Sequence, residues 1–144
     1  MLPDWAIFLY IQAVFVSIAA WESHIDPEGW AKTGQGWRIK IGARELTGYH
    51  FWCWLVMLPL LLLMPLAIYG WDKHLFIVLA VSAFIGIVIE DFLWFVFNPK
   101  FTVAKWNSEY AKWHWWIKIG KFEIPEFYIL LPIVAILIWY IFLL

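Results

Sequence analysis

Two adjacent acids, Glu90 and Asp91, stand inside a long apolar segment of the chain. Carboxyl groups are costly in an apolar environment, so their presence there indicates a function or a specific partner. Ser82, Gly86 and Glu90 recur at spacings of four and therefore share one face of a helix. Small residues let helices approach closely, so we expect this face to point into a helix bundle. Asp91 is rotated from Glu90 by about 100°.

Histidines and one further acid could complete a metal site with Glu90. Imidazole and carboxylate groups are ligands for zinc, iron, manganese and copper. The sequence contains no His-x-x-x-His or Glu-x-x-His pair that would place two ligands on adjacent helical turns. One hypothesis is therefore a transition-metal site assembled from distant segments. Its candidate ligands are Glu22, His24, His50, Glu90 and His114.

A second hypothesis uses the acids alone. Glu90 and Asp91 are candidate catalytic residues because a carboxylic acid among aromatic side chains can donate a proton to a lipid-soluble substrate, such as an isoprenoid. Aromatic rings can then stabilise the cation that forms. Either chemistry predicts a polar Glu/His site at the cytoplasmic side of a membrane bundle.

Two further readings remain open. Intramembrane acids can mark a proton or ion path. The outer half of the bundle, however, offers few polar residues that could continue such a path. Alternatively, Glu90 and Asp91 bond Arg38, Arg44 or a histidine and hold the loops in place. The protein would then be a non-catalytic accessory or structural subunit of a larger membrane complex, or a homo-oligomer.

The composition predicts a membrane protein. Of the 144 residues 65% are hydrophobic, 22% aromatic and only 15% charged, and the mean hydropathy is +0.77. So few charged side chains cannot cover the surface of a soluble globule of this size. The net charge of −1 gives no reason to expect nucleic acid as a partner. The single cysteine, Cys53, excludes a disulfide within the chain.

Four apolar segments approach the length of about 20 residues that a helix needs to cross the hydrocarbon core of a bilayer. They run over Trp5–Trp21, Phe51–Tyr69, Leu75–Phe97 and Phe127–Leu144. We therefore predict an all-α integral membrane protein with four transmembrane helices. Pro59 and Pro65 predict kinks in the second helix. The first segment lacks a basic leader and a cleavage pattern, so we expect a retained helix there.

Charge predicts how these helices are oriented. Nine of the ten basic residues lie in the two long segments that follow the first and third helices. The positive-inside rule places both long loops in the cytoplasm and both termini outside. Thirteen tryptophans and the loop lysines suit contact with membrane lipid. On the first helix, a stripe of mostly small residues predicts the inward face: Ala6, Tyr10, Ala13, Ser17, Ala20 and His24.

The two long loops resemble each other. "GWRIKIGARELTGYHFW" at 36–52 and "HWWIKIGKFEIPEFYIL" at 114–130 have identical residues at six positions at an offset of 78. This similarity predicts one transmembrane domain of two tandem helix-loop-helix repeats, about 1–70 and about 71–144. Alternating apolar and polar residues predict a short half-buried strand in each loop, ending at Gly42 or Gly120. These strands should form hairpins or pair with each other, with an interfacial helix or coil as the alternative.

Overall fold

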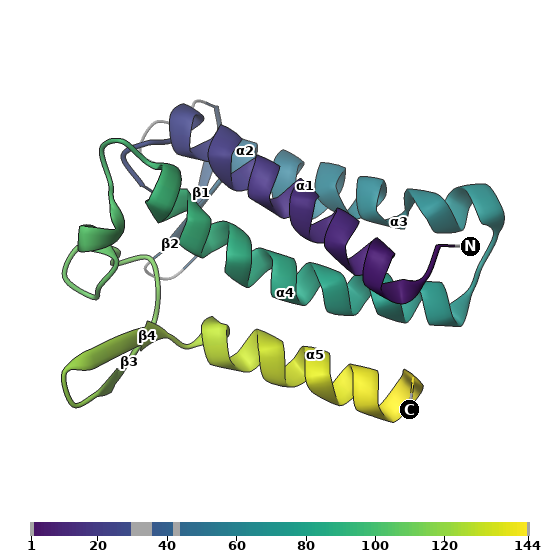
Figure 1. The fold of residues 1–144 in the computed structure, drawn as a ribbon. Coiled ribbons are helices and arrows are strands. Elements are labelled where there is room, and N and C mark those ends of the chain that lie inside the picture. Colours follow the sequence, from purple (N-terminus) through teal and green to yellow (C-terminus); the bar gives the residue numbers. More distant parts are fainter. Residues whose placement is uncertain (1, 30–35, 42–43, 144) are drawn as a thin grey trace.

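Most of the chain is helical in the computed structural model, which describes residues 2–29, 36–41 and 44–143 (Figure 1). The long helices are α1 (Asp4–Ile25), a continuous helix over Gly48–Tyr69, and α4 (Lys73–Phe97), and each is long and apolar enough to cross a membrane. The last helix, α5 (Phe127–Leu143), is also apolar but has 17 residues. At 1.5 Å per residue α5 is about 26 Å long, slightly less than a typical hydrocarbon core.

The helix over Gly48–Tyr69 changes its hydrogen-bonding pattern along its length. It starts as a short α2 (Gly48–His50), widens into the π-helix η1 (Phe51–Met57), and continues as α3 (Leu58–Tyr69). The Leu58 N–H bonds the Cys53 carbonyl five residues back, immediately before Pro59. Proline has no N–H and its ring clashes with the preceding turn of an α-helix, which gives a physical reason for the wide turn at this point.

Close contact between α1 and α4 forms the centre of the fold. Ser82, Gly86 and Glu90 are all buried, as their spacing predicted. Phe15 of α1 lies directly over Gly86, where even a Cβ atom would overlap its ring. The Gln12 amide donates to the Ser82 carbonyl at 3.0 Å, beside this contact. α4 therefore contributes the small-residue face, and α1 fills it with a large aromatic side chain.

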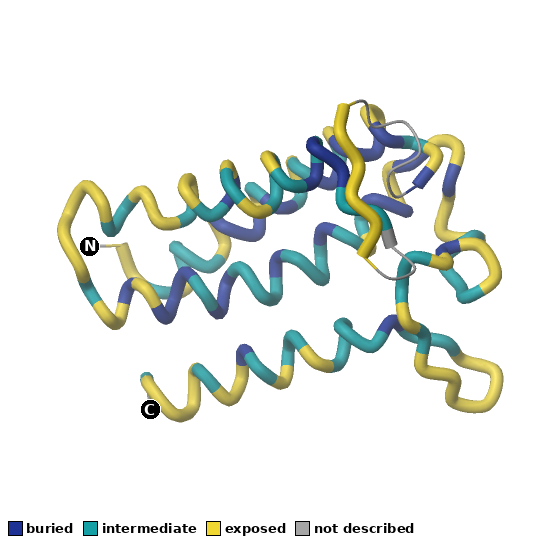
Figure 2. Tube along the Cα trace, turned by 180° about the vertical axis from the view of Figure 1, so that it is seen from behind, coloured by how far each residue is buried: buried dark blue, intermediate teal, exposed yellow. Residues whose placement is uncertain are grey.

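The predicted inward face of α1 was wrong. Tyr10 and Ala13 are exposed, whereas the buried face carries Ile11, Phe15 and Ala19. A small-residue stripe need not face a neighbouring helix when that neighbour already supplies the small residues, because two such stripes would leave a gap. Figure 2 shows that burial follows α4 and the neighbouring side of α1.

Each long loop contains a two-stranded antiparallel hairpin, as one of the alternatives predicted. The first pairs β1 (Arg38–Ile41) with β2 (Arg44–Thr47), and the second pairs β3 (Trp116–Ile119) with β4 (Phe122–Pro125). Gly120 takes a positive φ of 61° in the second turn, and the Gly42 turn lies outside the described residues.

The prediction that these strands are half-buried was wrong. All four residues of β1 are exposed, and so are three of the four residues of β3. Alternation in sequence gives two chemically different faces, but it does not determine whether another element covers one of them.

The loops are tied to the helix ends by polar contacts. The buried Asn98 amide donates to the Pro27 carbonyl at 3.0 Å, which joins the loop after α1 to the end of α4.

Within the second loop, after the 3₁₀ turn η2 (Val103–Lys105), the Ser108 N–H donates to the Glu123 carboxylate at 2.7 Å. That bond, together with Lys118, lowers the pKa of Glu123 to about 2. This contribution to stability is complete above the usual carboxyl pKa of 4.5 and is lost as the pH falls towards 2.

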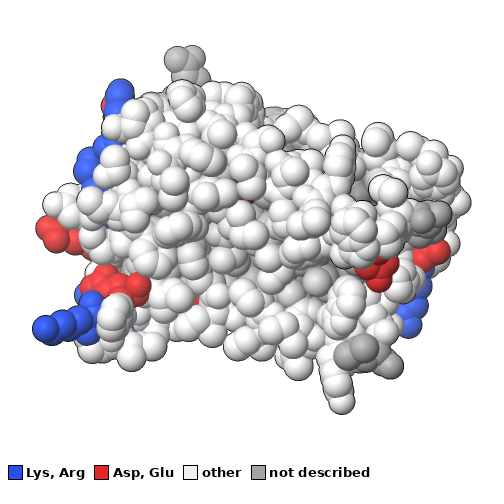
Figure 3. Space-filling model, viewed as in Figure 1, with Lys and Arg blue, Asp and Glu red and all other residues white. Residues whose placement is uncertain are grey.

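On the face that Figure 3 shows, charged side chains gather at the two ends of the molecule, and almost none lie in its middle. Both hairpins lie at one end, and both termini with the turn after α3 lie at the other (Figure 1). At the latter end His74 Nε2 is 3.0 Å from Asp4 Oδ1, linking α4 to α1. A band without charge between two charged ends is the distribution that a bilayer favours.

The contact between Phe15 and Gly86 predicts a clear mutational result. Gly86→Val should lower the free energy of unfolding by about 1–3 kcal/mol, because the added side chain overlaps the Phe15 ring. The cost should shrink when Phe15→Ala is introduced as well. Melting temperatures in detergent provide the measurement, with Ala13→Val on the exposed face of α1 as a control. An unchanged melting temperature for Gly86→Val would contradict this packing.

Candidate functional site

Two buried acids from different helices meet near the end of the bundle that carries the hairpins. Glu22 of α1 and Glu90 of α4 are 7% and 5% exposed, and their carboxyl groups lie within hydrogen-bonding reach of each other. Glu90 Oε1 has no hydrogen-bond partner in the described structure. Two carboxyl groups can hydrogen-bond only when one of them carries a proton. The pair is therefore suited to hold and pass on a proton.

Two donors from the second long helix fix Glu22. The Tyr49 hydroxyl donates to Glu22 Oε1 at 2.7 Å, and the Trp54 indole N–H donates to the same oxygen at 3.0 Å. Tyr49 and Trp54 are five residues apart, so an α-helix would rotate them by about 140° from each other. The π-helix η1 brings residues five apart onto one face. The widened helix that follows Tyr49 thus brings Trp54 to the same carboxylate oxygen.

We call Glu22, Glu90, Tyr49 and Trp54 the inner cluster. His50 borders it: the ring is buried, its Nδ1 lies 2.7 Å from the Thr47 hydroxyl, and Glu22 is close enough to act on its charge. The Thr47 hydroxyl also caps the start of this helix by accepting from the His50 N–H. Thus β2 ends directly at the polar site, and the first hairpin helps to place it.

Asp91 takes part in a second group on an adjacent side of α4. The Tyr128 hydroxyl of α5 donates to Asp91 Oδ2 at 2.7 Å. His114 Nε2 lies 3.2 Å from Asp91 Oδ1, although the geometry does not make a hydrogen bond. Aromatic rings surround His114, including Phe95 and Phe127. We call Asp91, His114 and Tyr128 the outer cluster.

The structure separates the residues that the sequence suggested as metal ligands. Glu22, His50 and Glu90 belong to one region, and His114 belongs to the outer cluster. The His24 ring is exposed and its Nδ1 lies 2.7 Å from the Ala20 carbonyl of its own helix. Among residues 2–29, 36–41 and 44–143, no three His, Cys, Asp or Glu side chains gather in a way that could hold a metal ion. A transition metal stays a prediction of the sequence.

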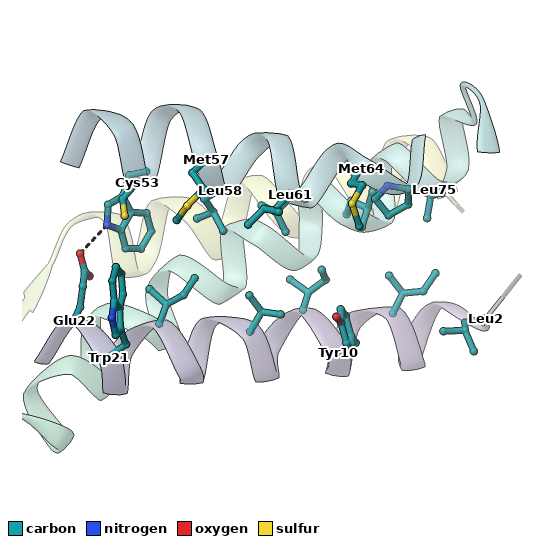
Figure 4. Close-up of a pocket in the computed structure, with 18 of the residues that line it drawn as sticks. Leu2, Tyr10, Trp21, Glu22, Cys53, Met57, Leu58, Leu61, Met64 and Leu75 are labelled. Carbon is teal, nitrogen blue, oxygen red and sulfur yellow. Dashed lines mark hydrogen bonds between the residues drawn. The ribbon is translucent and has the colours of Figure 1, made fainter. Parts of the chain in front are cut away.

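A long apolar groove leads to the inner cluster. It has a volume of about 840 Å³ and runs between α1 and the helix formed by η1 and α3, with Leu75 and Leu79 of α4 along it. Figure 4 shows Trp21, Glu22 and Cys53 at one end and Leu2 and Leu75 at the other. The Glu22 carboxyl is thus the acid that a molecule in the groove would meet. Glu90 lies behind it and is not part of the groove wall.

The partners that define these clusters were not among the candidates from the sequence. Tyr49 and Tyr128, which hold Glu22 and Asp91, were both missed. Gln12, buried in the middle of α1, was missed as well. The available signal was the position of each tyrosine, since each stands near the start of a long helix directly after a hairpin.

These features define a helical protein with helices of membrane-spanning length, a paired-carboxyl site at one end and an apolar groove that opens onto this site. No protein-family model, curated protein or solved structure matches the chain. The function must therefore be inferred from the geometry of the groove and of the inner cluster.

The bond from Tyr49 to Glu22 should contribute measurably to stability. Tyr49→Phe should lower the free energy of unfolding by about 1 kcal/mol, because it removes a hydrogen bond to a buried carboxyl group. The loss should be smaller in a Glu22→Gln background, and a double-mutant cycle measures the difference. Tyr69→Phe, at a position that is 82% exposed, serves as the control. Equal losses in both backgrounds would show that Tyr49 does not act through Glu22.

Proposed function

We propose that this protein is a membrane enzyme whose inner cluster performs acid/base chemistry on a lipid-soluble substrate held in the groove. The observation that carries the proposal is the end of the apolar groove at Glu22, which is paired with the buried Glu90. An apolar cavity with a few convergent polar groups is the usual form of a small-molecule site. Here the convergent groups are acids and the substrate must be apolar enough to enter.

The roles of the two acids follow from their positions. Glu22 touches the substrate, and Glu90 holds the proton that Glu22 passes on. When the substrate has a carbon–carbon double bond, Glu22 transfers a proton to one carbon and leaves a cation on the other. Loss of a proton from a neighbouring carbon back to the carboxylate then forms a new double bond. The net reaction is an isomerisation, or a ring closure when a second double bond attacks the cation, and it needs no other reactant.

Aromatic side chains at the same end of the groove suit this chemistry. Trp21 and Trp54 line it beside Glu22. Indole faces stabilise nearby cations, with a larger effect where water is excluded. Trp54 also donates to Glu22 Oε1 and so helps to stabilise the carboxylate that forms when the proton leaves.

We also propose how the chain crosses the membrane. The chain would cross the bilayer four times, with α5 as the fourth helix packed against α4, both hairpin loops in the cytoplasm and both termini outside. The uncharged middle of the molecule supports this arrangement (Figure 3). The two hairpins have the same register 78 residues apart, which supports an origin in tandem repeats.

Deuterium transfer tests the chemistry without requiring a chosen substrate. Protein in vesicles of a total lipid extract in D₂O should introduce deuterium into a neutral lipid, because the carboxyl protons exchange with solvent. Mass spectrometry of the extracted lipids measures the incorporation. Glu22→Gln and Glu90→Gln should reduce it by about 100-fold or more, the usual contribution of a general acid.

The control is Glu28→Gln, which removes an exposed acid outside the groove and should retain full incorporation. Lipid extracts from several membrane types should be compared, so that an absent substrate is not mistaken for absent activity. Incorporation that is equal in the native protein and in Glu90→Gln would contradict acid/base chemistry at this pair. No incorporation from any extract would favour the alternative of a non-catalytic subunit of a membrane complex.

A further inference from the structure

We infer that the groove binds an uncharged long-chain lipid with its polar end at Glu22 and its apolar chain extending along α1 towards Leu2. This inference deepens the proposed function, on which it rests for the role of Glu22 as the reacting group. Three properties of the groove identify this class of ligand: its length, its volume and the charge of its lining.

The length of the groove suits an extended chain. Its wall follows α1 from Leu2 to Glu22, a distance of about 30 Å at 1.5 Å per residue. This distance matches the thickness of a hydrocarbon core. The chain of an occupant can therefore lie parallel to the helices over their whole length, with apolar contacts such as Ile11, Leu61 and Leu75 throughout.

The volume of the groove, about 840 Å³, lies in the range typical of small-molecule sites. A narrow volume spread over a long wall fits a single extended chain.

The charge of the residues that line the groove determines which end group of a lipid can bind there. Among the described residues that line the groove there is no Lys, Arg or His, and Glu22 is its one carboxylate residue. Phosphate and carboxylate end groups are normally bound by basic side chains or by several N–H groups. Here such a group would meet the Glu22–Glu90 pair, in which Glu90 Oε1 already lacks a partner. An anionic end group is therefore repelled, whereas an uncharged hydroxyl or carbonyl can hydrogen-bond the pair.

A matched set of isoprenoid probes tests this inference by binding alone. Geranylgeraniol and its diphosphate have the same chain and differ in the charge of the end group. Titration of each into the purified native protein, followed by tryptophan fluorescence, should give at least tenfold tighter binding of the alcohol. Trp21 and Trp54 line the groove beside Glu22 and provide the signal. Equal or tighter binding of the diphosphate would overturn the assignment of an uncharged end group.

Variants of the groove distinguish recognition of the ligand's end group from recognition of its apolar chain. Glu22→Gln removes the negative charge and should reduce the preference for the alcohol by at least fivefold, whereas Glu28→Gln should preserve it. Leu61→Trp fills the groove and should weaken binding of both probes by at least tenfold; a control, Leu130→Trp, adds the same side chain at an exposed position of α5. Unchanged binding to Leu61→Trp would show that the probes bind elsewhere.

Photolabelling determines the direction of the bound chain. A geranylgeraniol analogue with a diazirine beside the hydroxyl should label the segment around Trp21, Glu22 and Cys53 (Figure 4). Labelling of the segment around Leu2 instead would overturn the orientation. Binding in this orientation without deuterium transfer would leave the ligand assignment intact and contradict the proposed chemistry, so the two failures are distinguishable.

Discussion

The contact between Phe15 and Gly86 is the constraint on which the rest of the structure depends. The Phe15 ring fills the space between α1 and α4 at this point, so that no residue larger than glycine fits at position 86. One helical turn beyond Gly86, the same face of α4 presents Glu90, and α1 meets it with Glu22. Packing of apolar groups therefore creates the acid pair, because burial beside a second carboxyl group is by itself unfavourable for both Glu22 and Glu90.

The rest of the polar site compensates for this burial. Tyr49 and Trp54 supply two hydrogen bonds to Glu22, and the π-helix that aligns them occurs where Pro59 disrupts the regular helix. The wide helix also borders the groove, so one local departure from α-helical geometry both holds the acid and shapes its approach. About 100° around α4 from Glu90, Tyr128 bonds Asp91. The adjacent acids that first marked this segment thus serve two separate clusters.

The sequence predicted those features that follow from a regular period. The long helices, the inward direction of Glu90 and the strands of the two loops all come from repeats of 3.6 or two residues. The pairing of Glu22 with Glu90 could not be predicted in this way, because it depends on how Phe15 fits a distant glycine. Tyr49 and Trp54 were equally inaccessible to periodic arguments, since their common direction requires a π-helix. The exposure of β1 depends on where the loop extends, which no local pattern specifies.

Chemical cross-linking tests the central claim, the direct meeting of Glu22 and Glu90, most directly. In a Cys53→Ser background with a protease site in the turn at Gly70, Glu22→Cys with Glu90→Cys should be joined rapidly by a short dithiol-reactive reagent. The two cleaved fragments should then remain linked on a denaturing gel. Glu22→Cys with Asp91→Cys should react far more slowly, because Asp91 faces α5. Equal or faster linkage to position 91 would contradict the account.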